Sequence, residues 1–158
     1  MKLNEIIHQI QGAHTPEWNK WLENILSLFD CSTGTIHILE GEPNLLILKA
    51  QVGVPEFLLP KMSQIPIGKG MAGIAAERKK AVQVCNLQTD ESGVVRPGAK
   101  DTKVEGAITV PLLIKDKLFG TLGIAKKIPY EFSENETEDL TLIANTMAEK
   151  VKVMQDSV

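Results

Sequence analysis

Cysteine is scarce in this sequence: Cys31 and Cys85 are the two in 158 residues, and they lie far apart. Two cysteines are too few for a disulfide framework, which fits a reducing compartment. No apolar run approaches the roughly eighteen residues that cross a bilayer, and Lys2, Glu5 and His8 interrupt the start of the chain, unlike a secretory signal peptide. The sequence therefore predicts a cytoplasmic protein with no membrane partner.

An excess of charge of one sign is also missing. The chain has 17 Lys and Arg against 20 Asp and Glu, a net charge of −3. A nucleic-acid-binding chain needs a basic stripe that displaces counterions from phosphates, so we expect no nucleic-acid partner. The three histidines, His8, His14 and His37, lie in different predicted elements without ligand-type spacing, so we expect no metal site.

The composition that is present is typical of a folded domain. Hydrophobic residues make up 43% of the chain and charged residues 23%, whereas a disordered chain has fewer apolar residues and a larger net charge. The length is that of one domain. We expect a single domain over residues 1–158, with its core at about 18–151 and an N-terminal helix within 1–14.

Apolar residues recur at helical spacing in two N-terminal segments. The first segment ends near Gly12, which suits a helix C-terminus, and its apolar positions are Leu3, Ile6, Ile7 and Ile10. The second helix is predicted to begin with Thr15 as the N-cap and Pro16 in the first helical position. Its apolar stripe is Trp18, Trp21, Leu22, Ile25 and Phe29.

Strand-forming segments occur in two pairs. Residues 35–40 and 45–51 form the first pair and 106–114 and 118–126 the second, each joined by a short turn, which predicts two β-hairpins. Residues 45–48 are apolar at every position, which is typical of a strand covered on both faces.

The middle of the chain is less regular. Residues 55–62 resemble a helical turn, Gly68 and Gly70 permit a tight turn, and 71–80 are rich in helix-forming residues. A short strand at 81–85 leads into the polar segment 86–103, and loops of that length in compact domains are usually functional lids or disordered.

The final helix is marked by a capping box. Ser133 and Glu136 have the spacing at which each side chain satisfies a backbone N–H of the other residue. The apolar face of this helix is Leu140, Ile143, Ala144, Met147 and Val151.

This order of elements predicts an α+β fold of the α/β sandwich type. Terminal helices should cover one face of an antiparallel sheet, and the middle helix and long loop should cover the other. Together with the segments 65–70, 106–112 and 118–124, the order resembles that of a GAF domain over roughly Trp18 to Val151. The resemblance implies a sheet of about six strands. It also implies a cavity beneath the middle helix and loop, where relatives hold cyclic nucleotides, tetrapyrroles, amino acids or no known ligand.

The cyclic-nucleotide-binding relatives share a pattern of Asn-Lys, then Phe, then Asp-Glu. Lys126, Phe132 and Glu136 match part of it, but Ala125 and Thr137 replace the Asn and the final Glu. The alternative, that Phe132 packs at the start of the helix and Glu136 caps it, is favoured.

Free-standing relatives reduce free methionine sulfoxide with cysteine thiolates, and this chain lacks those residues. The positions that correspond to their cysteines are Met62, Ala72 and Lys100. The positions near which their substrate-binding acidic residues fall are Ala107, Gly123 and Ala125. We therefore expect no catalytic residues and no enzyme activity, and a cysteine-dependent redox enzyme is the third hypothesis.

Bilin-binding relatives attach their chromophore through a pocket cysteine, for which Cys85 is the one candidate. A free cysteine, including Cys31, is more often a small buried hydrophobe, so we expect no cofactor.

The candidate ligand-binding residues are His37, Met71, Cys85, Thr89, Asp90, Arg96, Lys100 and Thr109. His37 alternates with Ile36 and Ile38, so it either points into the cavity or is a satisfied core histidine. Met71 lies at the start of a helix whose free N–H groups suit an anion. Arg96 suits a carboxylate or phosphate.

We expect a non-catalytic sensory domain that binds a small polar or anionic molecule. The alternative is a homodimeric interaction module with an unoccupied pocket. Its surface would be the apolar stripes of the terminal helices, Leu3 to Ile10 and Trp18 to Phe29, with Met154 and Val158.

Overall fold

The computed structural model describes residues 1–41, 45–95, 100 and 102–156. The helices are α1 (Leu3–Gly12), α2 (Trp18–Phe29), the 3-10 helix η1 (Glu56–Leu58), α3 (Leu59–Met62), α4 (Gly70–Arg78) and α5 (Glu134–Asp156). The strands are β1 (Thr33–Glu40), β2 (Leu45–Val52), β3 (Gln64–Pro66), β4 (Val82–Val84), β5 (Ala107–Ile114) and β6 (Lys117–Ala125).

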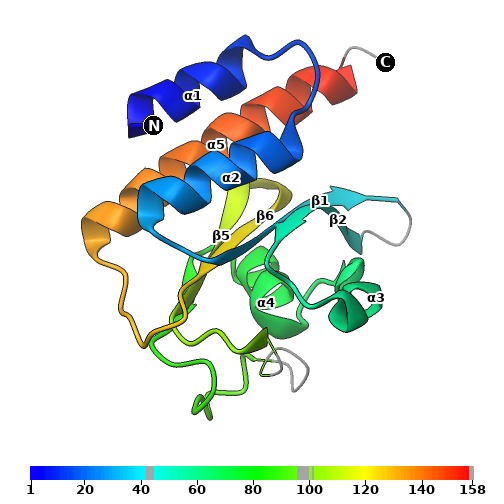
Figure 1. Ribbon diagram of the computed structural model, residues 1–158. Coiled ribbons are helices and arrows are strands. Elements are labelled where there is room, and N and C mark those ends of the chain that lie inside the picture. The colour runs from blue at the N-terminus through cyan, green and yellow to red at the C-terminus, as the bar shows by residue number, and fades with distance from the viewer. Residues whose placement is uncertain (42–44, 96–99, 101, 157–158) are drawn as a thin grey trace.

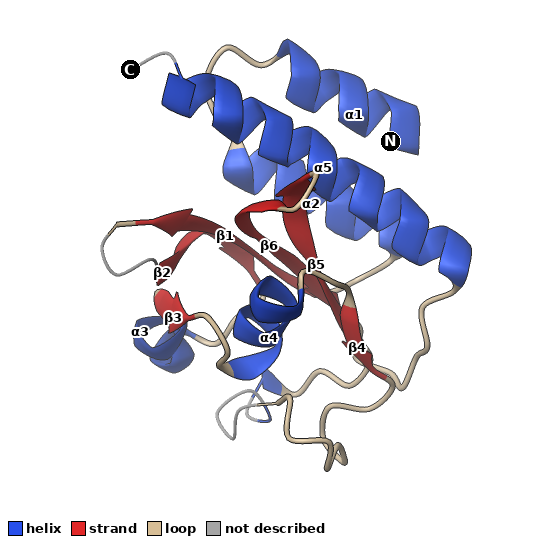
Figure 2. Ribbon diagram, turned by 180° about the vertical axis from the view of Figure 1, so that it is seen from behind, coloured by secondary structure: helices blue, strands red, loops and turns tan. Residues whose placement is uncertain are grey.

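The strands form one six-stranded sheet in the order β3-β2-β1-β6-β5-β4, and every neighbouring pair is antiparallel. Helices α1, α2 and α5 form a layer over one face (Figure 1). The view from behind shows α3 and α4 on the opposite face (Figure 2). This arrangement confirms the predicted α+β fold, with terminal helices on one face and the middle helix on the other.

The helical layer is fixed by apolar side chains that are completely buried. They are Ile6 and Ile10 of α1, Trp21 and Ile25 of α2, and Met147 of α5. Burying a side chain of this size removes enough apolar surface from water to stabilise the fold by about 1.5–3 kcal/mol. The apolar stripes predicted on the first two helices are therefore largely buried in the core of this chain.

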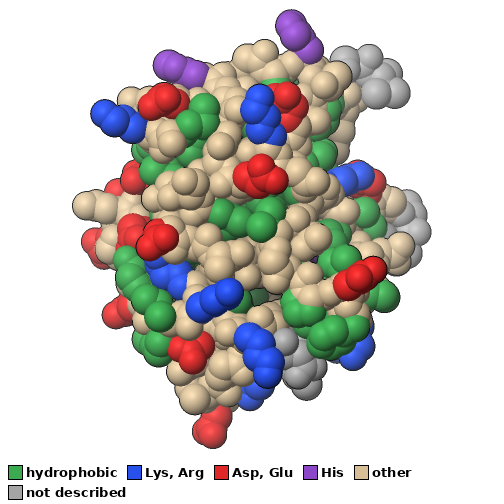
Figure 3. Space-filling model, viewed as in Figure 1, with side chains coloured by type: hydrophobic (Ala, Val, Ile, Leu, Met, Phe, Trp, Pro, Cys, Tyr) green, Lys and Arg blue, Asp and Glu red, His purple; other side chains and the backbone are tan. Residues whose placement is uncertain are grey.

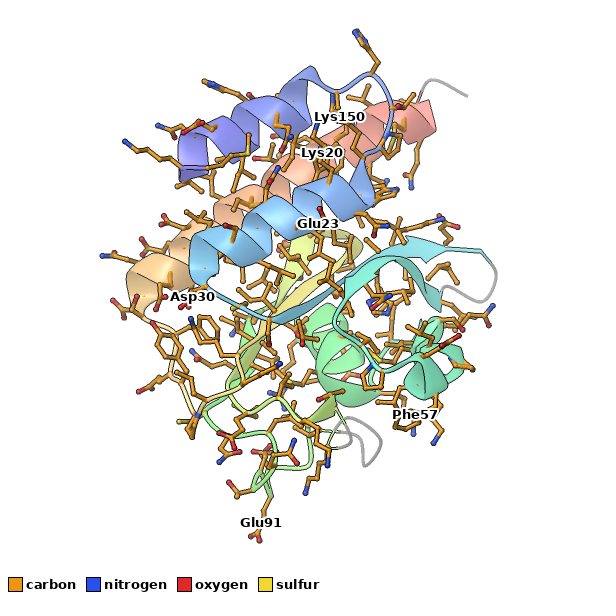
Figure 4. All side chains as sticks on the ribbon, viewed as in Figure 1. Lys20, Glu23, Asp30, Phe57, Glu91 and Lys150 are labelled. Atoms are coloured by element: carbon orange, nitrogen blue, oxygen red, sulfur yellow. The ribbon has the colours of Figure 1, made fainter. Side chains whose placement is uncertain are left out.

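The start of α2 differs from the prediction. The helix begins at Trp18 with Glu17 at the N-cap position and no side-chain cap hydrogen bond, so Thr15 does not cap it. Residues 13–17 instead reverse the chain direction between α1 and α2. Lys150 of α5 stabilises this connection, because its Nζ lies 2.8 Å from the carbonyl oxygen of Gln11 and 2.9 Å from that of Ala13 (Figure 4).

The start of α5 is as predicted. The backbone N–H of Ser133 donates to Glu136 Oε1 over 2.9 Å, and the N–H of Glu136 donates to Ser133 Oγ over 3.1 Å. Tyr130 Oη also donates to both carboxylate oxygens of Glu136. These bonds fix the chain between the sheet and the last helix.

Two features of the sheet edge differ from the residue pattern. The three-residue strand β3 pairs with β2 through Leu46 and Ile65, and no hydrophobic alternation could reveal so short an element. Pro66 is tolerated there because β3 is an edge strand.

The prediction that β2 is covered on both faces is wrong, since it is fully buried only at Leu46 and Ala50. The other residues of β2 are only half-buried.

Within the described ranges, no helix has the length and apolar character needed to span a membrane.

Candidate ligand-binding pocket

A pocket of about 510 Å³ lies between the sheet and the segment that carries α3 and α4. Its floor is formed by β1, β5 and β6, with Thr35, His37, Thr109, Gly123 and Ala125 among the lining residues. Its walls are formed by Leu58, Met62, Met71 and Ala72, and by Leu87, Val95 and Val104 of the long loop. This volume is in the range of small-molecule sites, which are typically about 300–1,000 Å³.

A glycine turn places the start of α4 at the pocket wall. Gly68 and Gly70 have φ angles of 95° and 68°, which side-chain-bearing residues rarely adopt. The N–H of Gly68 donates to the Gly73 carbonyl over 2.8 Å, which closes the turn. A Cβ at Gly73 would lie 2.5 Å from the carbonyl oxygen of Pro66. Glycine is therefore required both for the turn and for the close packing of α4 on it.

The N-terminus of α4 is uncapped on the pocket side. No side chain accepts a hydrogen bond from this helix end. The N–H groups of Gly70, Met71 and Ala72 have no hydrogen-bonding partner within the described part of the chain, and all three residues line the pocket. Such free donors, at the positive end of a helix dipole, favour an anionic group.

The charged side chains that line the pocket also favour an anionic ligand. Among the described lining residues, Lys61 and Lys69 are cationic, and none is an Asp or Glu. Both lysines are exposed to solvent, so salt screens their effect. The remaining lining is largely apolar.

His37 lies in the floor and is 1% exposed. Its Nε2 is 2.9 Å from the carbonyl oxygen of Met62. A carbonyl only accepts hydrogen bonds, so Nε2 carries the proton and Nδ1 of the neutral ring is an acceptor. Burial lowers the pKa of His37, and the hydrogen bond to Met62 opposes this effect. The ring is therefore neutral at pH 7.

Three of the predicted site residues meet at the pocket: His37, Met71 and Thr109 line it together. They come from β1, α4 and β5, which are far apart in sequence. Burial of Thr109 and His37 in the floor leaves their polar atoms away from bulk water.

The other predicted residues do not line the described pocket. Cys85, Thr89 and Lys100 are exposed. The Asp90 carboxylate accepts hydrogen bonds from the N–H and Oγ of Ser92, at 3.2 and 2.7 Å, and so shapes the loop itself. The tip of that loop, marked by Glu91, points away from the body of the molecule (Figure 4). Arg96 lies outside the described residues.

Several lining residues were missed in the sequence. Thr33 and Thr35 alternate with His37 on β1, so the same period-two argument that singled out His37 could have found them. Lys69 lies inside the glycine turn that the sequence did reveal. Lys61 carries no such signal, because its place at the pocket depends on how α3 packs.

Six positions of this chain correspond, by the resemblance, to cysteines or acidic residues of the reductases. Five of these six positions line the pocket. Met62 and Ala72, in place of cysteines, line it, and so do Ala107, Gly123 and Ala125, in place of acidic residues. Lys100 is exposed. These five positions contribute neither a thiol nor a carboxylate to the pocket.

The residues that match part of the cyclic-nucleotide pattern are engaged elsewhere. Lys126 binds the end of α2, Phe132 is buried in the core at 4% exposure, and Glu136 caps α5. None of the three lines the pocket. The prediction that Phe132 packs and Glu136 caps is confirmed. Within the described residues, no group of three or more His, Cys, Asp or Glu is arranged to hold a metal ion.

Comparison with known families agrees with this architecture. The sequence model of the GAF domain matches residues 19–151, and the chain belongs to the GAF domain family. This is a family of sensory and ligand-binding signalling domains. No curated protein sequence shows significant similarity to the chain.

Solved structures of similar fold cover nearly the whole chain. The GAF domain of an Acinetobacter phosphoenolpyruvate-protein phosphotransferase is 18% identical with a TM-score of 0.82, over 98% of this chain and 92% of that one. The GAF domain of A. aeolicus nlh2, in an inactive state, is 22% identical with a TM-score of 0.74, over 96% and 94%. The fRMsr of Staphylococcus aureus, in its reduced form, is 25% identical with a TM-score of 0.70, over 94% and 92%.

Proposed function

We propose that this chain is a non-catalytic sensory domain whose pocket binds a small anionic molecule with an apolar body. The observation that carries the proposal is the uncapped N-terminus of α4 at a pocket of about 510 Å³. The free N–H groups, which carry the positive end of the helix dipole, stabilise an anion at such a position by about 0.3–1 kcal/mol in total, and Lys69 and Lys61 add to this attraction.

The described lining has no acidic side chain, which supports an anionic rather than a cationic ligand. A ligand ammonium group would meet two lysines and no carboxylate, an arrangement that repels it. The apolar walls, including Leu58, Met71 and Val104, favour an occupant with a hydrophobic body.

The cysteines support a non-catalytic role. The relatives that reduce free methionine sulfoxide, with which the sequence was compared residue by residue, use cysteine thiolates for this reaction. Neither cysteine of this chain lines the described pocket. Cys31 is half-buried, and burial raises the pKa of its thiol to about 11, which suppresses the nucleophilic thiolate.

Surface charge supports the absence of a nucleic-acid partner. On the face drawn in Figure 3, anionic side chains lie among the cationic ones, and the net charge of the chain is −3. Binding of a phosphate backbone depends on an excess of positive charge.

Ligand-induced thermal stabilisation tests the proposed function. Phenylpropionate provides a carboxylate and an apolar ring, and phenylpropanamide is its uncharged analogue. We expect the acid to raise the melting temperature in a dose-dependent way and the amide to raise it less, since a ligand at one hundred times its Kd stabilises the fold by about 2.7 kcal/mol. Failure of every tested organic acid to stabilise the chain would contradict the proposal.

A homodimer through the terminal helices is the second candidate, and exposed side chains on α5 favour it. Leu142 and Val153 are 49% and 63% exposed and lie on one face of the helix. The stripes of α1 and α2 are buried in the chain itself, so α5 would supply the surface. We expect Leu142→Glu with Val153→Glu to convert a dimer into a monomer in sedimentation experiments. A wild-type monomer at high concentration would exclude this candidate.

A further inference from the structure

The pocket floor contains a buried acceptor without a donor. Nδ1 of His37 is inaccessible to solvent and has no hydrogen-bonding partner in the described structure. Its ring is held in place from the other side, since Nε2 donates to Met62. Burial of an unpaired polar atom destabilises a fold by about 1–3 kcal/mol, so native structures rarely leave one without a partner or a function.

The residues nearest to His37 on the sheet do not satisfy this atom. Thr121 lies opposite His37 in the β1–β6 pairing, and its Oγ1 is also buried and unpaired within the described residues. Thr121 does not line the pocket, and the hydrogen bond to Met62 fixes the position of the imidazole. The tautomer is fixed too, which makes Nδ1 a constant acceptor at neutral pH.

We infer that His37 Nδ1 receives a hydrogen bond from a neutral donor on the ligand, so the ligand class is a small organic anion that bears a hydroxyl or amide N–H. The inference rests on the proposed function and adds a specificity-determining residue to it. The donor is neutral because the described lining offers two lysines and no carboxylate, so a charged ammonium donor would be repelled. The anion lies toward α4 and Lys69, and the donor lies toward β1.

A matched set of acids tests this assignment. Phenyllactate and hydroxyphenylpropionate add a hydroxyl near either end of phenylpropionate, and phenylpyruvate carries a carbonyl acceptor instead. We expect at least one hydroxylated acid to bind about tenfold or more tightly than phenylpropionate in calorimetry, and phenylpyruvate to gain nothing, because an acceptor facing Nδ1 leaves both atoms unpaired. Equal affinities for all the acids would overturn the inference while the proposed function stands. Binding of no acid would overturn both.

The variant His37→Phe tests the residue. The ring keeps a similar volume but has no acceptor, so we expect the ratio of the two affinities, hydroxylated acid over phenylpropionate, to fall to about one. A retained advantage would overturn the assignment.

Nitrogen NMR of the wild-type imidazoles decides the question even where that variant fails to fold. We expect the unprotonated Nδ1 resonance of His37 to move upfield when the hydroxylated acid binds, and the resonances of the exposed His8 and His14 to stay unchanged. A His37 Nδ1 that is already hydrogen-bonded in the free protein, and insensitive to the acid, would show that a buried water fills this role. That result would overturn the inference.

Discussion

The ammonium group of Lys126, at the end of β6, donates hydrogen bonds to the carbonyl oxygens of Phe29 and Asp30, at 2.7 and 3.0 Å. These carbonyls lie at the C-terminal end of α2, where the helix dipole is negative. The ammonium also lies 4.5 Å from the centroid of the Tyr130 ring. Lys126 is only 8% exposed, so the fold holds a nearly buried charge by three favourable contacts.

Lys126→Met should destabilise the fold by about 2 kcal/mol. The methionine keeps most of the apolar stem but leaves both carbonyl oxygens without their donor. Denaturant unfolding measures the change. Lys127→Met is the control, because Lys127 is exposed and should change stability by less than about 0.5 kcal/mol. Equal effects of the two substitutions would show that Lys126 is not the cap of α2.

Gly73→Ala should destabilise the chain by about 1–3 kcal/mol and weaken ligand binding. The new methyl group would lie 2.5 Å from the Pro66 carbonyl oxygen, a backbone atom that cannot move without disturbing the turn before α4. The control is Gly12→Ala, where a Cβ would meet nothing within 4 Å. That change should leave stability equal or slightly higher, since alanine favours a helix. An unaffected Gly73→Ala protein would contradict the packing described for α4.

The two cysteines should differ in reactivity by a large factor. Burial raises the pKa of Cys31 to about 11, so roughly one molecule in a thousand or fewer carries the Cys31 thiolate near pH 7.5. Cys85 is exposed. Mass spectrometry after alkylation should find one fast label, on Cys85, in the native protein and two labels in the unfolded protein. Rapid native labelling of Cys31 would contradict its burial.

The free energy of unfolding should fall as the pH decreases below about 6.5, because His37 is buried as a neutral ring. Burial lowers its pKa in the folded state, so the unfolded chain binds the proton first and the free energy of unfolding declines as pH falls toward the folded pKa. The neutral His37 makes its full contribution to the free energy of unfolding at pH values above the pKa that this histidine has in the unfolded chain. In His37→Phe this part of the slope, at most about 1.4 kcal/mol per pH unit, should vanish.

Urea unfolding at a series of pH values measures that slope. His8 and His14 are present in both proteins, so the difference between the two curves isolates His37. Parallel curves would show that His37 is not buried as a neutral ring.

Lys69→Gln should weaken the binding of phenylpropionate about two- to fivefold and reduce its dependence on salt. Lys69 lines the pocket beside the N-terminus of α4, and an exposed ionic contact contributes only a few tenths to about 1 kcal/mol. Lys20→Gln removes the same charge from the outer face of α2 (Figure 4) and should not change affinity. An equal effect of both substitutions would point to net charge rather than to a site.

Local signals predicted much of the fold. The capping box of Ser133 and Glu136 depends on residues three apart, so the sequence contains the whole feature. The apolar stripe from Trp18 to Phe29 is likewise a property of one helix. The resemblance to GAF domains, based on the order of the elements and on three short segments, is confirmed by the family match.

The rest could not be predicted because it depends on packing between distant segments. Strand β3 exists only through its pairing with β2, and that pairing brings α3 and Lys61 to the pocket. The loop after Cys85 has no periodicity, so no pattern could show which of its residues face inward. Leu87, Val95 and Val104 do so, while the polar Thr89 is exposed.

One peptide bond separates the pocket from the helical layer. Ala125 lines the pocket, and the next residue, Lys126, holds the end of α2 on the opposite face of the sheet. The carbonyl of Ala125 also accepts the N–H of Ser32, just beyond α2, over 3.0 Å. A shift of β6 by an occupant of the pocket would therefore reach the end of α2 through the Lys126 side chain and through this backbone hydrogen bond. The main chain at the end of β6 thus connects the pocket directly to the helical layer.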